Sequence, residues 1–235
     1  MYELSDIDTY KDLVSKADFI INFIPFLKGL DEFIVEQARN AEFLHMGSRL
    51  QFDQMEIEID EKSNTKPQNK YAKVKLEIEE LYKKANGILI RASNVYGPSQ
   101  NFFTKKTTDT YLLSPMLKGK ELCVDIPKEA FKDMLYIDDL TNAIVSLFQN
   151  GDKCKGEVFV IGSSRKTTIA EMVDVLQDNF VDSKIRYEPI KDREKESFVF
   201  DCAKVERFAN WRAKYSFREG FGRTITTLKK QKVSE

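Results

Sequence analysis

Tyr71 and Lys75 lie four residues apart in a segment, residues 70–86, that has a helical pattern. Side chains four apart on a helix share a face, so the phenol and the ammonium would be neighbours. The ammonium favours the phenolate and would lower a tyrosine pKa that starts near about 10. Such a tyrosine can donate and accept a proton at neutral pH. Chance also produces this spacing, which Tyr187 and Lys191 repeat, so the pair needs support from its surroundings.

Two further polar residues follow the expected buried strands on either side of this helix in the sequence. Ser48 comes after a strand expected at 43–46, and Asn94 comes after a strand expected at 88–90. In open α/β sheets, ligands bind at the carboxyl ends of the strands. Either residue alone is typical of a turn, but their order around Tyr71 predicts that all three face one crevice.

Expected strands and helices alternate along the chain. We expect helices at 8–16, 28–40, 70–86, 109–118, 138–149, 168–179 and 216–231, and extended segments at 19–24, 43–46, 88–90, 121–125, 131–136, 157–161 and 184–187. This order predicts an α/β fold with a parallel sheet and helices on both faces. In the third helix, an apolar stripe is formed by Val74, Ile78, Leu81 and Ala85.

Composition excludes several classes of protein. Lys and Arg number 37 against 38 Asp and Glu, so the net charge of -1 gives no general attraction for nucleic acid or an anionic membrane. The best apolar run, residues 19–27, is broken by Asn22 and Pro25, and we expect no membrane span.

Cys123, Cys154 and Cys202 are far apart and odd in number. They indicate free thiols in a reducing compartment, which predicts a soluble cytoplasmic protein without a metal site.

Glycines are scarce early in the chain, where only Gly29 and Gly47 precede residue 87. A loop that binds phosphates needs clustered glycines between a strand and a helix. Gly220 and Gly222 precede a helical pattern but follow no expected strand, so they do not predict such a loop.

Longer segments carry a resemblance that reaches through nearly the whole chain. They are EFLHMGSRLQFD, NKYAKVKLEIEELY, ILIRASNVYGP, AFKDMLYIDDLTNAI, GEVFVIGSSRKTTIAEM, DCAKVERFANW and FREGFGRTI. In these segments the sequence resembles the extended short-chain dehydrogenase/reductase family, in particular its nucleotide-sugar epimerase/dehydratase group. The most specific match is the third segment, which follows the family's Arg-x-x-Asn-x-Tyr-Gly-Pro pattern.

The resemblance implies a Rossmann-like domain for NAD or NADP and a small C-terminal mixed α/β lobe for a nucleotide sugar. We expect the first at residues 1–95 and the second at 96–235, with elements interleaved back into the first domain. By resemblance, Tyr71 exchanges a proton with the sugar oxygen, Lys75 lowers the Tyr71 pKa and binds the nicotinamide ribose, and Ser48 hydrogen-bonds the same sugar oxygen.

Four other positions follow from the resemblance. Ser93 would contact the cofactor, while Asn94, Lys132 and Arg193 would contact the substrate. Lys132 replaces a usual arginine, which weakens any bidentate hydrogen bonding to a phosphate.

Two other features are expected to be structural. The only histidine, His45, alternates with apolar neighbours, and Asp138-Asp139 is expected at a helix N-terminus.

The chain also departs from the family pattern. The family opens with a strand, a glycine-rich turn and a helix, whereas Met1 falls near the end of the family's third strand. The segment 19–24 would therefore become an exposed apolar edge of a truncated sheet. Ile24-Pro25 stands where the family has two small alanines, and Arg49-Leu50 follows Ser48 where dehydratases have Asp-Glu.

Two hypotheses remain from the residues and the resemblance. The first is a nucleotide-sugar epimerase or 4-keto-sugar reductase that uses Tyr71 as acid and base, with a homodimer as one possible assembly. The alternative is a non-catalytic or incomplete homologue that binds a nucleotide sugar or a partner chain but not NAD(P) on its own.

Overall fold

A computed structural model describes residues 7–23, 29–38, 40–99, 102–104, 107–190 and 197–233. Arg193 and the Ile24-Pro25 pair lie outside these residues. The helices are α1 (Ile7–Ser15), α2 (Leu30–Gln37), α3 (Lys70–Lys84), α4 (Thr108–Leu117), α5 (Ile137–Gln149), α6 (Gly151–Cys154), α7 (Ile169–Asn179), α8 (Ala203–Ala209) and α9 (Phe217–Val233), with 3-10 turns η1 (Arg49–Gln51) and η2 (Phe102–Thr104). The strands are β1 (Phe19–Asn22), β2 (Glu42–Ser48), β3 (Glu58–Ile59), β4 (Ile88–Ala92), β5 (Asn94–Tyr96), β6 (Leu122–Val124), β7 (Phe131–Lys132), β8 (Met134–Tyr136), β9 (Val158–Ile161), β10 (Thr167–Thr168), β11 (Ile185–Tyr187) and β12 (Val199–Phe200).

The centre of the molecule is a four-stranded parallel sheet in the order β1-β2-β4-β9. Ser48 pairs with Ala92, and Ala92 pairs with Ile161, so three strands end level with one another. This confirms the predicted parallel sheet and places its carboxyl edge at these residues.

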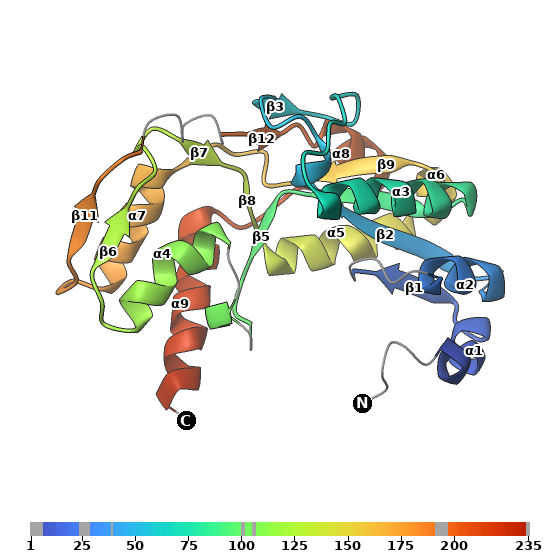
Figure 1. Ribbon diagram of the computed structural model, residues 1–235, viewed down its shortest axis with the longest axis horizontal. Coiled ribbons are helices and arrows are strands. Elements are labelled where there is room, and N and C mark those ends of the chain that lie inside the picture. The colour runs from blue at the N-terminus through green and yellow to red at the C-terminus, as the bar shows by residue number, and fades with distance from the viewer. Residues whose placement is uncertain are drawn as a thin grey trace.

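Helices cover both faces of the sheet, as predicted (Figure 1). On one face α2 and α3 pack over a core that includes Phe43, Ile78, Tyr82 and Leu89. On the other face α5 and α8 cover a larger core, with members such as Leu44, Ile90, Leu140, Leu147 and Val205. The near-continuous apolar sequence of β4 follows from this burial on both sides.

The face that α3 turns toward the sheet differs from the predicted one. Its fully buried residues are Ala72, Lys75, Ile78, Glu79 and Tyr82, whereas Val74, Leu81 and Ala85 are only partly buried. The apolar stripe is thus rotated away from the centre of the interface between α3 and the sheet. The buried positions are taken instead by Lys75, Glu79 and Tyr82, each of which has a buried polar partner.

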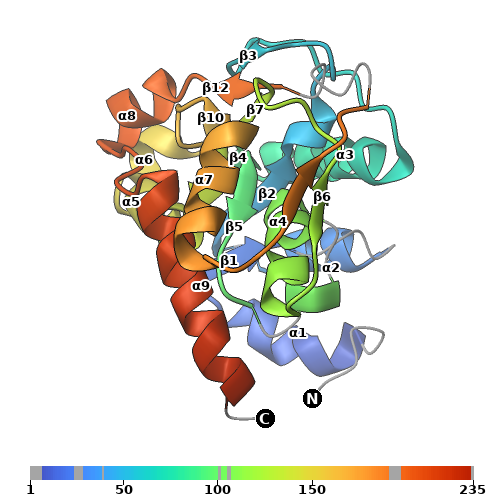
Figure 2. The ribbon, with the colours of Figure 1, turned by 90° about the vertical axis from the view of Figure 1, so that its left-hand side faces the viewer.

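A second core lies beside the sheet, among α4, α7 and α9 (Figures 1 and 2). Its buried members include Leu112, Met116, Leu122, Val173 and Phe221. Short strand pairs join this part to the rest: β5 with β8, β7 with β10, β6 with β11 and β3 with β12. Segments that follow residue 95 in the chain thus contribute to this core and to the core of the main sheet.

Strand β1 forms one edge of the sheet, since within the described residues it pairs only with β2. Phe19, Ile21 and Phe23 are between 41% and 57% exposed, which agrees with the apolar edge expected for this segment. Phe19 still packs edge-on against Phe148 of α5 at 5.0 Å between ring centroids. Among the helices in the described part of the chain, none is both long and apolar enough to span a bilayer.

Candidate active site

Ser48 ends β2 at the carboxyl edge of the sheet and begins the η1 turn, as its position in the sequence predicted. Its hydroxyl accepts a hydrogen bond from the Leu50 amide at 3.3 Å, and its own amide donates to Gln51 Oε1 at 2.7 Å. Gly47 makes room for this turn, since a Cβ there would lie 2.1 Å from Gln51 Oε1. The turn therefore fixes the Ser48 side chain at the end of its strand.

A buried network ties this turn to α3 and β4. Gln51 donates to Glu79 Oε2 at 2.8 Å, and Arg91 donates to both Glu79 oxygens at 3.0 Å and 2.6 Å. The Arg91 guanidinium also lies over the Phe52 ring at 4.8 Å. We did not predict this network, although Ser48-x-x-Gln51 is a capping-box pattern that could have indicated the turn.

Tyr71 and Lys75 occupy the first turns of α3, the helix that runs alongside β2. Lys75 is 1% exposed, and its Nζ donates to the carbonyl of Met46 at 2.9 Å, two residues before Ser48. Tyr71 lies one helical turn nearer the start of α3, about 6 Å along its axis, and is 44% exposed. The structure thus brings the Lys75 ammonium to the strand that ends in Ser48, with Tyr71 one turn away on the same helix.

The expected effect of Lys75 on Tyr71 is not what the structure shows. Burial raises the pKa of Tyr71 above its ordinary value, and the Lys75 ammonium donates to the Met46 carbonyl. Burial lowers the pKa of Lys75 to about 8. Tyr71 is therefore a protonated phenol at neutral pH, suited to donate a proton.

Ser93 and Asn94 follow β4 directly. Ser93 is buried, and its amide donates to the Ile161 carbonyl at 2.9 Å, so this residue stays at the edge of the main sheet. Asn94, which was expected to follow this strand end, begins β5 and pairs with Met134 of β8 in a separate two-stranded sheet. Its amide donates to the Asp133 carbonyl at 3.2 Å.

Lys132 ends β7, and Asp133 lies between β7 and β8. Lys132 is buried and pairs with Thr167 across β7 and β10. The Asp133 carboxylate, which we did not predict, accepts the amides of Ser163, Ser164 and Phe200 at 2.6, 3.1 and 3.0 Å. Burial raises the pKa of Asp133, while the hydrogen bonds from Ser163 and Phe200 lower it. Asp133 therefore joins two segments of the chain near the carboxyl edge.

His45 and Asp139, two other residues noted in the sequence, have partners in the structure. His45 is buried in β2 and stacks on Tyr82 with 5.1 Å between ring centroids. Asp138 and Asp139 lie in the first turn of α5, and Asp139 accepts the amides of Lys214 and Tyr215 at 2.9 and 3.1 Å. The described residues contain no cluster of three or more histidine, cysteine or acidic side chains able to hold a metal ion.

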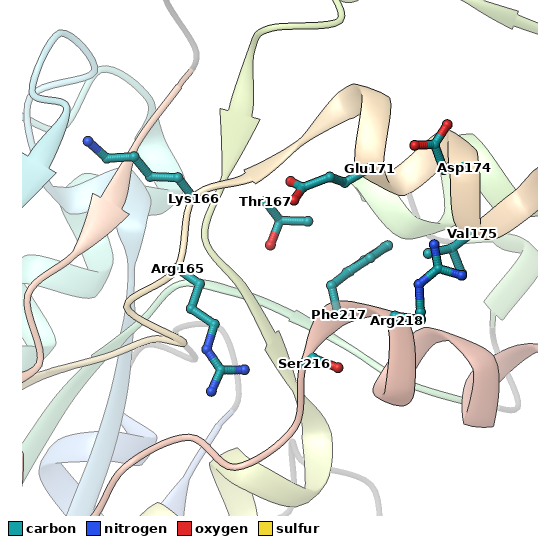
Figure 3. Close-up of a pocket in the computed structure, with 9 residues that line it drawn as sticks. All are labelled: Arg165, Lys166, Thr167, Glu171, Asp174, Val175, Ser216, Phe217 and Arg218. Atoms are coloured by element: carbon teal, nitrogen blue, oxygen red, sulfur yellow. The ribbon is translucent and has the colours of Figure 1, made fainter.

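A cavity of about 270 Å³ between α7 and α9 is a different candidate (Figure 3). It is lined by Arg165, Lys166, Thr167, Glu171, Asp174, Val175, Ser216, Phe217 and Arg218. Its cations are already engaged: Arg165 donates to the Tyr215 carbonyl at 3.0 Å, Arg218 pairs with Asp178, and Lys166 pairs with Glu58 at 3.0 Å. Figure 3 shows Lys166 extending away from Phe217. The sheet edge is thus the better candidate for chemistry.

Comparison with known proteins bears on the residues around that edge. The model of the NAD dependent epimerase/dehydratase family matches residues 30–162, more than half of the chain. The chain belongs to this family. The matched residues contain Ser48, Tyr71, Lys75, Asn94 and Lys132, so the epimerase/dehydratase segment includes the helix and strand ends described above.

Individual relatives agree with this membership. A dTDP-glucose 4,6-dehydratase from Streptomyces antibioticus is 27% identical over 149 residues, which are 61% of this chain and 43% of the relative. The aligned region thus spans less than half of the relative's length. A UDP-glucose 4-epimerase from Thermotoga maritima superposes with a TM-score of 0.83 at 19% identity, over 100% of this chain and 85% of that one. A UDP-glucuronic acid 4-epimerase from Bacillus cereus gives 0.81 at 17% identity, over 97% and 79%. These two structures show that the chain has the epimerase fold.

Proposed function

We propose that this chain acts on a nucleotide sugar as an epimerase or 4-keto-sugar reductase, with NAD or NADP as cofactor. The observation that supports this most directly is the position of α3 along β2. The Lys75 ammonium donates to the strand that ends in Ser48, and Tyr71 lies one turn earlier on the same helix. Family membership supplies the class of cofactor, and the solved relatives in complex with UDP-glucose or with UDP-glucuronic acid and NAD suggest the class of substrate.

The residues at the sheet edge fit one end of a dinucleotide better than the other. Tyr71, Lys75 and Ser93 offer hydroxyl and ammonium donors that suit a ribose and a nicotinamide amide. For the pyrophosphate, the described residues contain no cluster of glycines between a strand and a helix. The residues described here would therefore hold the nicotinamide side of the cofactor.

When bound, the nicotinamide supplies the exchange of a hydride with the sugar carbon. Tyr71 then gives its proton to the sugar oxygen as a carbonyl becomes an alcohol, and takes it back in the reverse direction. Its raised pKa favours the donor form, which suits reduction of a keto sugar. The Ser48 hydroxyl orients the same oxygen, and Lys75 binds the ribose hydroxyls.

Dehydration fits less well. Arg49 follows Ser48 at the position where an acidic residue would be needed, and its buried guanidinium lies over the Phe198 ring at 4.7 Å. Leu50, the next residue, is exposed and carries no ionisable group. The turn at residues 49–51 therefore offers no carboxylate as an acid or base for removing water from the sugar. We therefore favour epimerisation or keto reduction.

The Tyr71→Phe variant tests the proposal. It removes the hydroxyl that donates the proton and leaves the ring, so hydride transfer should fall by roughly 100-fold or more. Nucleotide-sugar affinity, measured by calorimetry with UDP- and dTDP-sugars, should stay close to that of the wild type. Tyr187→Phe, at the other Tyr-x-x-x-Lys spacing, is the matched control and should keep full activity. An unchanged rate in Tyr71→Phe would refute the role of Tyr71.

A second candidate function is a homologue that binds a nucleotide sugar, or a partner chain, but not NAD(P) on its own. The exposed apolar edge at β1 favours it, because Phe19, Ile21 and Phe23 suit a further strand and helix better than water. Calorimetry with NAD(H) and NADP(H) separates the two functions. Micromolar binding to this chain refutes the second candidate, and no binding at millimolar concentration refutes catalysis by this chain alone.

A further inference from the structure

One face of strand β1 exposes apolar side chains on the side of the sheet that carries α5. Phe19 and Ile21 lie two residues apart in the strand, so they point to the same face, and Phe23 continues this alternation. The three side chains are 57%, 41% and 46% exposed. The Phe19 ring packs edge-on against Phe148 of α5, with 5.0 Å between ring centroids, which identifies the face as the one that α5 covers.

The other face of β1 is filled. Ile20 packs against the core beneath α2 and α3, and Asn22 donates to Asp31 of α2 at 2.5 Å and to the Tyr82 hydroxyl of α3 at 3.1 Å. Within the described residues, β1 pairs with β2 along one edge and with no strand along the other. One face and one edge are therefore left open, and a strand with its helix would cover both.

The exposed side of α5 next to this strand carries no charge. Its stripe of exposed residues consists of Thr141, Val145 and Gln149, which are spaced four apart. Val145 is 48% exposed and lies three residues before Phe148, on the same side of the helix. Residues 140–151 include no charged side chain, although 32% of the chain is charged. Depletion of charge is typical of the core of a protein interface.

Strand and helix thus present one continuous uncharged surface. This β1–α5 surface is formed by Phe19, Ile21, Phe23, Thr141, Val145 and Gln149. Hydroxyl and amide side chains both donate and accept hydrogen bonds, so each kind can bond to its counterpart in another copy of the chain. Charged groups cannot do so, because like charges that meet across an interface repel. A surface of apolar, hydroxyl and amide groups is therefore complementary to itself.

We propose that the β1–α5 surface is the interface of a homodimer in which two copies of the chain extend one sheet. With a two-fold axis perpendicular to the sheet, β1 pairs antiparallel with β1 of the second copy, and both copies of α5 lie on the same face. Each copy then supplies the strand and the helix that the other lacks at this edge. The dimer does not depend on the proposed function, because the interface lies on β1 and α5 and uses none of the proposed catalytic residues.

The exposed area sets the strength expected of this dimer. Taking about 200 Å² for a phenylalanine side chain, Phe19 and Phe23 together expose roughly 200 Å² in each copy. Specific interfaces bury at least about 600 Å² per partner, so Ile21 and the stripe on α5 must contribute as well. An interface near this lower limit predicts reversible dimerisation, with a Kd of roughly 1–100 µM.

Sedimentation velocity of the full chain between about 1 and 300 µM tests the proposal. The wild type should change from monomer to dimer over this range. Ile21→Lys and Val145→Lys each bring like charges into the interface and should weaken association about 10-fold or more. Val181→Lys is the control and should dimerise like the wild type, because Val181 is 84% exposed in the loop between α7 and β11, away from β1 (Figure 1). A wild type that stays monomeric, or a dimer that neither Ile21→Lys nor Val145→Lys weakens, overturns the proposal.

A mixing experiment separates contact between two copies from a loss of folding. Ile21→Lys and Ile21→Glu should each associate weakly, since each repels its own copy. An equimolar mixture should associate about 10-fold more tightly than either variant alone, because opposite charges then meet at the interface. Circular dichroism should show that both variants are folded like the wild type. Folded variants whose mixture associates no more tightly than either variant alone overturn the proposal.

Discussion

Replacing Glu79 with glutamine breaks the buried network that joins α3 to the Ser48 turn. The side chains of Glu79 and Arg91 are 2% and 8% exposed, and three donated hydrogen bonds converge on the two Glu79 oxygens. The Glu79→Gln side chain has the same shape but one acceptor oxygen and no charge. Its amide nitrogen would face either Arg91 or Gln51, both of which donate here.

The size of the effect follows from this geometry. Removing one partner of a buried ion pair costs about 3–5 kcal/mol, because the other charge stays buried without compensation. For a chain of this length, each kcal/mol corresponds to about 2–4 °C in Tm. The Glu79→Gln variant should therefore melt roughly 6 to 20 °C below the wild type. The Ser48 turn, which depends on Gln51, should loosen at the same time.

Urea unfolding followed by circular dichroism measures the loss of stability. If the slope of the unfolding free energy against urea concentration is unchanged, the shift in midpoint reports stability alone. Glu80→Gln, an exposed carboxylate on the same helix, is the matched control and should change stability by less than about 0.5 kcal/mol. Adding Arg91→Met to Glu79→Gln removes the unpaired charge and should recover part of the loss. If Glu79→Gln is no less stable than Glu80→Gln, the pair does not hold α3 in place.

Two further changes test neighbouring parts of the site. His45 binds a proton in the unfolded chain below about pH 6.5, but in the folded chain only near pH 3. The free energy of unfolding should therefore fall by about 1.4 kcal/mol for each pH unit as the pH drops between these values. In His45→Phe, the urea midpoint should fall less steeply between pH 7 and pH 4 than in the wild type, and parallel curves would contradict this. Gly47→Ala puts a Cβ 2.1 Å from Gln51 Oε1 and should lower the free energy of unfolding by about 1–3 kcal/mol. In Gly222→Ala, in α9, the new Cβ meets nothing within 4 Å, so this control should melt at the wild-type temperature or above it. Equal changes in melting temperature for the two variants would rule out crowding at Gly47.

Long elements could be predicted from the sequence because their apolar periodicity extends over many residues. The four strands of the central sheet and the helices α3, α5, α7 and α9 all begin and end close to the expected bounds. The pairs β3–β12 and β7–β10 could not be predicted, because their strands have two residues each and their partners are distant in sequence. Such strands have no periodicity of their own, and tertiary contacts determine where they form.

The site could be predicted where it depends on local spacing. Ser48 at a strand end, and Tyr71 and Lys75 on one helix, follow from secondary structure, and the structure places them as expected. The raised pKa of Tyr71 could not be foreseen, because it depends on how far the fold buries the phenol. Asn94 follows the end of β4 as expected, and only its pairing with Met134 of β8, which is distant in sequence, could not be foreseen.

The polar face of α3 fixes the position of this helix and of Tyr71, for which we propose a catalytic role. Lys75, Glu79 and Tyr82 reach three different partners: a carbonyl of β2, Arg91 of β4, and Asp31 of α2. An apolar stripe packed against a sheet can slide or rotate at small cost, because apolar contacts are not directional. Hydrogen bonds to buried charges lose about 1–3 kcal/mol or more when their geometry is broken. Such a face therefore fixes the rotation and the axial position of α3, and with them the position of Tyr71 at the start of the helix.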